Sequence, residues 1–225
     1  MRTPHSYHHG NLKQALLDAS LEIIRKAGPG AFTLREVARR AGVSHNAPYR
    51  HFRDKEELLA ALAAEGFDLL TDAMNKAAET ATGSLEQFRA IGRGYVKFAL
   101  RYPQHFAVMF EVPWRHELHR QTQEAGGRAF GTLVRHVEQC QAEGLLPAGD
   151  ARPYALLAWS MVHGVAKLAV SGRLPLPNSA DALDFTDTAT AALWQGLGHA
   201  FTPSEEPRKT ERATPSAPRP LAHKR

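Results

Sequence analysis

The stretch Phe32–Phe52, FTLREVARRAGVSHNAPYRHF, decides the fold of the N-terminal part of the chain. Thr33 and Glu36 have the spacing of a capping box, in which the threonine hydroxyl accepts from the backbone N–H three residues on and the glutamate reaches back. Gly42 ends the helix that begins there, because a sharp turn requires a residue that tolerates positive φ. A second helix is predicted over roughly Ser44–His51, with its first residue as the cap. The stretch therefore predicts a helix-turn-helix.

The second predicted helix carries polar side chains that a protein core does not need. We expect these residues to be exposed: Ser44, His45, Asn46, Tyr49 and Arg50. Asparagine can pair with adenine through two hydrogen bonds and arginine with guanine, so this face suits the major groove of duplex DNA. A proline at the edge of its first turn removes about one intrahelical hydrogen bond and predicts a short helix. Periodicity alone leaves open an ordinary pair of surface helices.

Four strings of residues carry a resemblance to a known family. They are Thr33-Leu34-Arg35-Glu36-Val37-Ala38, Ala41-Gly42-Val43-Ser44, Tyr49-Arg50-His51-Phe52 and Asp54-Lys55-Glu56-Glu57-Leu58-Leu59. In this order they resemble the DNA-binding domain of the tetracycline-repressor (TetR) family of bacterial regulators, from about Tyr7 to Leu62. The resemblance implies a three-helix head, a homodimer and a ligand-responsive C-terminal helical domain.

The resemblance also implies roles for individual side chains. Residues at the positions of Thr33, Tyr49 and Lys55 contact phosphates in the family, and those at 44–47 lie towards the base edges. The predicted DNA-binding residues are Thr33, Arg35, Ser44, His45, Asn46, Ala47, Tyr49, Arg50, His51 and Lys55. The family does not name the operator, because the positions at 45–47 vary within it.

The charge of the chain is distributed unevenly. Residues 1–55 carry 10 basic and 4 acidic side chains, net +6, whereas residues 56–201 carry 12 and 16, net −4. Residues 202–225 carry 6 and 3, net +3, with five prolines and little to bury, and are predicted to be disordered. A basic N-terminal part joined to an acidic body is typical of a DNA-reading domain fused to a domain of another function.

Helical periodicity and helix caps continue through the rest of the chain. The predicted helices cover 11–27, 54–80, 85–102, 104–110, 114–143, 150–171 and 180–201, in addition to the pair in the helix-turn-helix. Ser84 and Gln87 predict a capping box at the start of the third of these helices. The fold class is therefore all-α, with a DNA-binding domain at 1–55 and a ligand-binding and dimerisation domain at 56–201. The last two helices are apolar enough to pair with a second copy, and the family pairs them in this way.

Aromatic side chains at helical spacing suggest a ligand pocket in the C-terminal domain. The candidate ligand-binding residues are Phe98, Tyr102, Phe106, Met109, Phe110, Trp114, Trp159 and His163. As a set they suit a small apolar or aromatic effector, although each of them can equally be a core residue. Trp159, His163 and Gly164 form a W-x-x-x-H-G string that resembles a TetR subset. His163 is either a ligand contact or a histidine satisfied between helices.

Several classes of function lack support in the sequence. No phosphate loop, nucleophile elbow or metal set is present, so we expect no enzyme and no cofactor. No run of about 18 apolar residues and no signal peptide appears, which indicates a cytoplasmic protein without membrane contact. The single cysteine, Cys140, fits a reducing compartment, as a packing residue or a redox thiol. We expect a transcriptional regulator, a ligand-responsive repressor that binds a palindromic operator as a homodimer; an activator remains open.

Overall fold

The computed structural model describes residues 12–30, 32–112, 120–176 and 178–200. Over these residues the chain forms α-helices and one 3-10 turn and no strand, which confirms the predicted all-α fold. The elements are α1 (Leu12–Ala27), α2 (Leu34–Arg40), the 3-10 turn η1 (Pro48–Arg50), α3 (Lys55–Glu79), α4 (Ser84–Arg101), α5 (Pro103–Glu111), α6 (Arg120–Ala142), α7 (Arg152–Val170) and α8 (Ser179–Ala200). The predicted tail at 202–225 lies outside the described residues.

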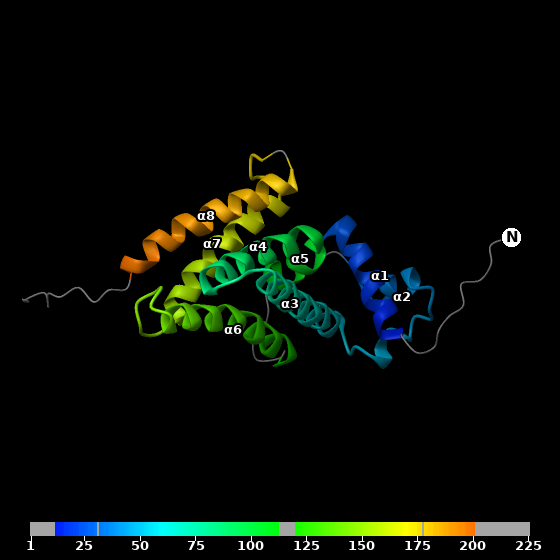
Figure 1. Ribbon diagram of the computed structural model, residues 1–225. Coiled ribbons are helices and arrows are strands. Elements are labelled where there is room, and N and C mark those ends of the chain that lie inside the picture. The colour runs from blue at the N-terminus through cyan, green and yellow to red at the C-terminus, as the bar shows by residue number, and fades with distance from the viewer. Residues whose placement is uncertain (1–11, 31, 113–119, 177, 201–225) are drawn as a thin grey trace, which may run out of the picture.

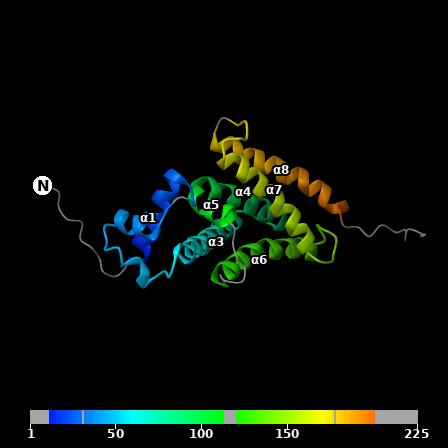
Figure 2. The same cartoon turned by 180° about the vertical axis from the view of Figure 1, so that it is seen from behind.

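The molecule is elongated, with a small head at one end and a larger body (Figure 1). The head comprises residues 12–54, with α1, α2 and η1, and the body comprises residues 55–200. The long helix α3 begins at the head and runs into the middle of the body. Seen from behind, α6 lies along one side of α3 and the α7–α8 pair lies on the other side of the body (Figure 2). One apolar core continues from the head into the body along α3.

The capping box at the start of α2 is confirmed. The backbone N–H of Glu36 donates to Thr33 Oγ1 at 3.3 Å, and the backbone N–H of Thr33 donates to Glu36 Oε2 at 2.9 Å. Phe32 and Val37 are both buried beside this start. Gly42 follows the helix with a φ of 70°, so the predicted left-handed turn is present.

The second predicted helix is shorter than the sequence indicates. Residues 44–47 form turns, and only Pro48–Arg50 adopts a 3-10 turn. A proline has no backbone N–H, so Pro48 cannot donate to the carbonyl of Ser44, and an α-helix cannot continue through this point. The chain instead makes tight bonds, from the N–H of Ala47 to the Ser44 carbonyl at 3.0 Å and from the N–H of His51 to the Pro48 carbonyl at 2.9 Å.

The capping box predicted at Ser84 is wrong. The N-cap of α4 is Gly83, with a φ of 86°, and no side chain caps this end. Ser84 is the first residue of the helix and is buried, and its hydroxyl donates to Glu143 Oε1 at 2.5 Å, at the far end of α6. A partner 59 residues away is invisible to a local spacing rule.

Close packing of α3 on α4 depends on one glycine. A Cβ at Gly94 would lie 2.8 Å from the carbonyl oxygen of Ala73 and 3.0 Å from the Cβ of Ala77. Any side chain there would push the two helices apart.

A second apolar cluster lies at the far end of the body and packs Cys140 beside Val137. Cys140 is fully buried. Burial, aided by the charge of Glu143, raises the pKa of its thiol to about 11.

Candidate functional site

The head exposes a group of polar side chains. Of the predicted DNA-binding residues, the following are exposed: Thr33, Arg35, Ser44, His45, Asn46, Tyr49, Arg50 and His51. Tyr49 keeps 52% of its surface exposed, although a tyrosine ring would gain stability by burial. The turns around Pro48 hold this surface on a stretch of backbone that is fixed at both ends by buried residues, Val37 and Phe52.

Two predicted contact residues do not lie freely on that surface. Ala47, which the resemblance directs towards the base edges, is instead buried at 9% exposure, because its methyl group packs inward where the chain tightens before Pro48. Lys55 Nζ donates to the carbonyl oxygen of Gly30 at 2.6 Å and lies 4.5 Å from the centre of the Phe32 ring. Partial burial lowers the pKa of Lys55, against the charge of Glu36.

Ion pairs neutralise some of the basic residues of the head. Arg40 pairs with Glu22 of α1, and Arg53 pairs with Glu57 at 3.1 Å. Arg50 forms no ion pair with any described residue, and it lies on the same turn as Tyr49. Two exposed arginines of α2, Arg35 and Arg39, likewise form no ion pair with any described residue, so the positive charge available to a partner lies on α2 as well as on η1.

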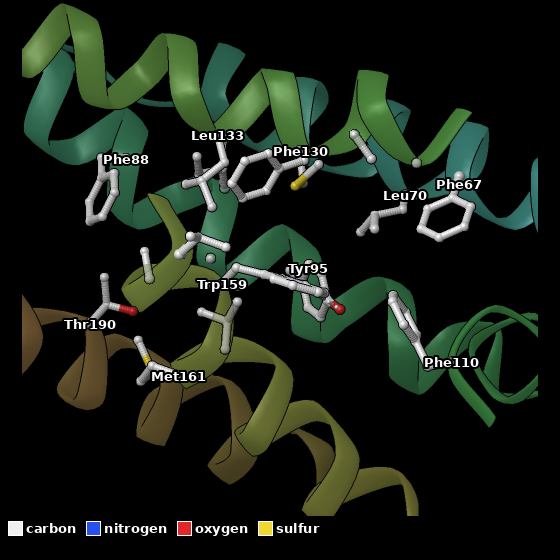
Figure 3. Close-up of a pocket in the computed structure, with 18 of the residues that line it drawn as sticks. Phe67, Leu70, Phe88, Tyr95, Phe110, Phe130, Leu133, Trp159, Met161 and Thr190 are labelled. Atoms are coloured by element: carbon white, nitrogen blue, oxygen red, sulfur yellow. Dashed lines mark hydrogen bonds between the residues drawn. The ribbon is translucent and has the colours of Figure 1, made fainter. Parts of the chain in front are cut away.

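The body holds a partly open cavity of about 400 Å³ between α3, α4, α6, α7 and α8. Figure 3 shows side chains from these helices converging on it, with Phe110 of α5 at one end. The lining residues are Phe67, Leu70, Met74, Phe88, Ile91, Gly92, Tyr95, Phe110, Gly126, Gly127, Ala129, Phe130, Leu133, Leu156, Ala158, Trp159, Met161, Val162 and Thr190. None of them carries a charge, so the cavity suits an uncharged apolar molecule.

A hydrogen-bonded group of three side chains stands at this wall. Tyr95 Oη lies 2.9 Å from Nδ1 of His163 and accepts from Trp159 Nε1–H at 3.3 Å. Burial raises the pKa of Tyr95 above its usual range. Burial also lowers the pKa of His163, and the charge of Lys167 lowers it further. Both groups are therefore uncharged near pH 7.

The predicted ligand-binding set divides in two. Phe110 and Trp159 line the cavity. The other described members lie in the surrounding packing and not at its wall: Phe98, Tyr102, Phe106, Met109 and His163. Trp114 lies outside the described residues. His163 stands behind Tyr95, with its ring stacked on Phe106 at a centroid distance of 5.3 Å, so its partner in the structure is a side chain of α4.

Sequence reasoning missed most of the cavity wall. Phe67, Tyr95 and Phe130 come from three different helices, and no local pattern joins them. One signal was available in the pair Gly126-Gly127, since two adjacent glycines weaken a helical pattern and leave a helix face without side chains. α6 stays helical at these two glycines, and the absence of side chains there leaves space for the cavity.

Two family descriptions match the chain. "Bacterial regulatory proteins, tetR family" matches residues 16–62, and "Tetracyclin repressor-like, C-terminal domain" matches residues 88–193. The chain belongs to the TetR family. The head therefore corresponds to the N-terminal domain of the family, and most of the cavity wall belongs to the family's C-terminal domain. The finer subset suggested by the W-x-x-x-H-G string stays a prediction.

Curated TetR relatives match only part of the chain. The HTH-type transcriptional activator FasR of Mycolicibacterium smegmatis is 32% identical over 96 residues, which are 43% of this chain and 44% of FasR. The HTH-type transcriptional regulator BetI of Escherichia coli K12 is 40% identical over 76 residues, 33% of this chain and 39% of BetI. The chain thus spans less than half the length of these relatives.

Solved structures match over most of the chain. A protein of unknown function from Rhodococcus sp. RHA1 is 37% identical, with a TM-score of 0.73, over 86% of this chain and 99% of that one. FadR of Bacillus subtilis, solved in complex with stearoyl-CoA, is 16% identical, with a TM-score of 0.69, over 82% of this chain and 98% of that one. At 16% identity the second likeness shows the TetR fold alone.

Two further classes of site were sought in the part of the chain that the structure describes. None of its helices is both long and apolar enough to cross a lipid bilayer. Its histidine, cysteine and acidic side chains form no group of three or more that could hold a metal ion.

Proposed function

We propose that this TetR-family chain is a DNA-binding transcriptional regulator that binds a palindromic operator as a homodimer in the bacterial cytoplasm and responds to a small uncharged effector in the body cavity. The observation that carries the proposal is the exposed polar surface of the head, from Ser44 to Arg50. It collects base-reading and phosphate-binding side chains that contribute nothing to the core. A repressor is the leading form.

Charge supports the proposed binding to DNA. The net +6 of residues 1–55 attracts the phosphate backbone, and a dimer doubles it. Because the bound protein displaces counterions from the duplex, its affinity should fall steeply as salt rises. The acidic body favours orientations that direct the head towards the DNA.

Exposed apolar side chains support the homodimer. Leu156, Leu157 and Leu168 of α7 and Phe185 of α8 each keep more than two fifths of their surface exposed. Large apolar groups gathered on two neighbouring helices are typical of a contact surface. A dimer is also a functional need, because two heads must reach half-sites about 34 Å apart along the duplex.

The cavity supports control by an effector. Its volume of about 400 Å³ and its uncharged wall fit a small apolar or aromatic molecule. Such a ligand can change the affinity for DNA only if it binds one arrangement of the two heads better than another. Stearoyl-CoA, the ligand of a distant relative, carries a charged nucleotide part that this wall cannot accommodate, so only an acyl chain would fit inside.

An activator is the second candidate form. It is favoured by one observation, the similarity to a relative that is named as a transcriptional activator. Both forms require the same head and cavity. Transcription from a promoter carrying the selected operator, measured with and without the chain, separates them by the sign of the change.

The decisive experiment is selection of bound sequences from random duplex DNA, followed by mobility shifts on the selected operator. Asn46→Ala should change the preferred base at one position, at a cost of roughly 1–3 kcal/mol on the original operator. Tyr49→Ala should weaken binding to all sequences alike, because Tyr49 is assigned to a phosphate. Lys76→Ala, at an exposed site of α3 in the body, is the control for general damage. Binding without any sequence preference would refute the proposal.

A further inference from the structure

The polar groups at the cavity wall are few, and each has already committed its proton. Tyr95, Trp159 and Thr190 are the only lining side chains with a hydroxyl or a ring N–H among the described residues. Trp159 donates its indole N–H to Tyr95, and Thr190 donates its hydroxyl to the carbonyl oxygen of Thr186 at 2.8 Å, within α8. Backbone N–H groups in the surrounding helices are used by the helices themselves.

The proton of Tyr95 is committed to His163. A buried tyrosine with a raised pKa keeps its proton, and a neutral imidazole nitrogen is the strongest acceptor within its reach. We therefore assign the proton of this 2.9 Å contact to Tyr95 Oη, which makes Nδ1 of His163 the acceptor and leaves the imidazole proton on Nε2. The imidazole is held for this role by Phe106, stacked at 5.3 Å, and Phe110, edge-on at 4.6 Å between ring centroids.

The side chains of the cavity wall therefore offer hydrogen-bond acceptors and no donors to a ligand. A tyrosine oxygen has two lone pairs, and Trp159 uses one of them. The second lone pair of Tyr95 and those of Thr190 remain for a ligand. Figure 3 shows the Tyr95 and Trp159 side chains next to each other in the middle of the wall, with Thr190 and Phe110 at opposite ends.

We propose that Tyr95 is the specificity-determining residue of the cavity, and that it selects an uncharged, flat apolar molecule that donates one hydrogen bond, such as a phenol or an aromatic amine. His163 is a positioning residue that acts through Tyr95 by holding its proton away from the ligand. This inference rests on the proposed effector cavity and adds the chemical class that the cavity takes.

The preference follows from what an unsuitable ligand loses. An ether or ester that enters the cavity gives up its hydrogen bonds with water and finds only acceptors facing it. Leaving such a polar group unpaired weakens binding, so we expect a matched donor to bind about tenfold more tightly than an acceptor, a difference of about 1.4 kcal/mol.

The experiment is displacement of a neutral fluorophore, N-phenyl-1-naphthylamine, from the full-length chain by two probes of one shape. 2-Naphthol donates a hydrogen bond, whereas 2-methoxynaphthalene can only accept. We expect 2-naphthol to displace the fluorophore at about one tenth of the concentration. In Tyr95→Phe this ratio should fall to about one at an unchanged melting temperature, and the fluorophore, itself an aromatic amine with one N–H donor, should bind more weakly. Tyr102→Phe, which removes a hydroxyl outside the wall, should leave the ratio unchanged.

Substitutions at His163 test the positioning role separately. In His163→Leu the Tyr95 proton has no acceptor and turns towards the ligand, so the preference should shift to 2-methoxynaphthalene. His163→Gln offers a carbonyl oxygen instead and should restore the preference for 2-naphthol.

Three results would overturn the inference. They are equal displacement by both probes in the unchanged chain, a ratio that survives Tyr95→Phe, and a His163→Leu variant that keeps the original preference. Failure of the proposed function looks different, because the fluorophore would then not bind at all, or its binding would leave the affinity for the selected operator unchanged.

Discussion

The head and the body differ in how far along the chain their polar contacts reach. In the head, Thr33 bonds to Glu36 three residues on, and the ion pair of Arg40 with Glu22 spans 18 residues. In the body, Tyr95 meets His163 across 68 residues, and the buried hydroxyl of Thr122 donates to the carbonyl of Ala60 across 62 residues at 3.0 Å. The head is thus specified by short segments, whereas the cavity exists only when all of its helices are in place.

This difference predicts how far the structural effect of a substitution will extend. A change in the head should alter one cap or one surface and leave the cavity intact. A change at a helix crossing in the body should affect the whole fold, because one core continues along α3. Four substitutions test this contrast between head and body, in order of decreasing expected effect.

Gly94→Val should have the largest effect. The added side chain meets the backbone of α3 at Ala73, so the two helices must separate, and overpacking of this kind costs about 1–3 kcal/mol or more of unfolding free energy. Urea denaturation followed by circular dichroism measures it. Gly131→Val on α6 is the control, because a Cβ there meets only the flexible end of Arg135 at 3.7 Å. Equal losses at the two positions would show that the close α3–α4 approach has no special importance.

Thr33→Ala should cost about 1 kcal/mol, because α2 loses the hydroxyl that accepts the N–H of Glu36. Hydrogen exchange should show faster exchange in α2 and unchanged protection in α7. Thr188→Ala removes an exposed hydroxyl that caps no helix and serves as the control. If α7 lost protection to the same extent as α2, the head would not be the locally specified unit described above.

Gly126→Ala should stabilise the chain by up to about 1 kcal/mol, because alanine favours a helix interior over glycine. Its methyl group points at the Phe67 ring, 3.5 Å away, and takes space from the cavity. Displacement assays with N-phenyl-1-naphthylamine should therefore show weaker binding by a more stable protein. Gly131→Ala is the matched control, with the same gain in helix stability and unchanged binding, since Gly131 does not line the cavity.

Glu65→Gln should have the smallest effect, and one that depends on pH. Glu65 Oε2 lies 3.5 Å from Nε2 of buried His105, and this neighbour, opposed by burial and helped by Gln14, lowers the pKa of Glu65 below 4.5. A lowered pKa in the folded state adds stability above the unfolded value, which is lost as pH falls through the folded value. The stability difference between the two proteins should therefore be present at neutral pH and shrink in acid. Glu138→Gln, an exposed change on α6, is the control.

The contrast also explains which sequence predictions succeeded. The capping box of Thr33, the turn at Gly42 and the exposed polar face are encoded within a few residues, and all three are present. The α-helical form of the second helix was wrong, because Pro48 limits it to a 3-10 turn. Ala47, which only the family resemblance directs towards the base edges, is buried just before Pro48, and its contact with DNA stays a prediction.

The cavity could be predicted as a class of site but not as a set of residues. Aromatic side chains crowd the α4–α5 region, and periodicity alone cannot say which of them face a core and which a cavity. Phe106 stacks on His163 within the core, whereas Phe110 lies at the wall of the cavity. Thr190 belongs to α8, nearly a hundred residues after Tyr95, and only the assembled fold brings the two together at one wall.

The burial of Cys140 has a practical consequence for testing whether two heads pair as proposed. Its thiol is inaccessible and stays protonated at neutral pH, so it will not react with maleimides or methanethiosulfonates in the folded protein. A cysteine introduced at an exposed head position such as Arg39 would carry the label alone, without a background to remove. Spin labels placed there would report the span between the two heads of the proposed dimer, with and without operator or aromatic probe.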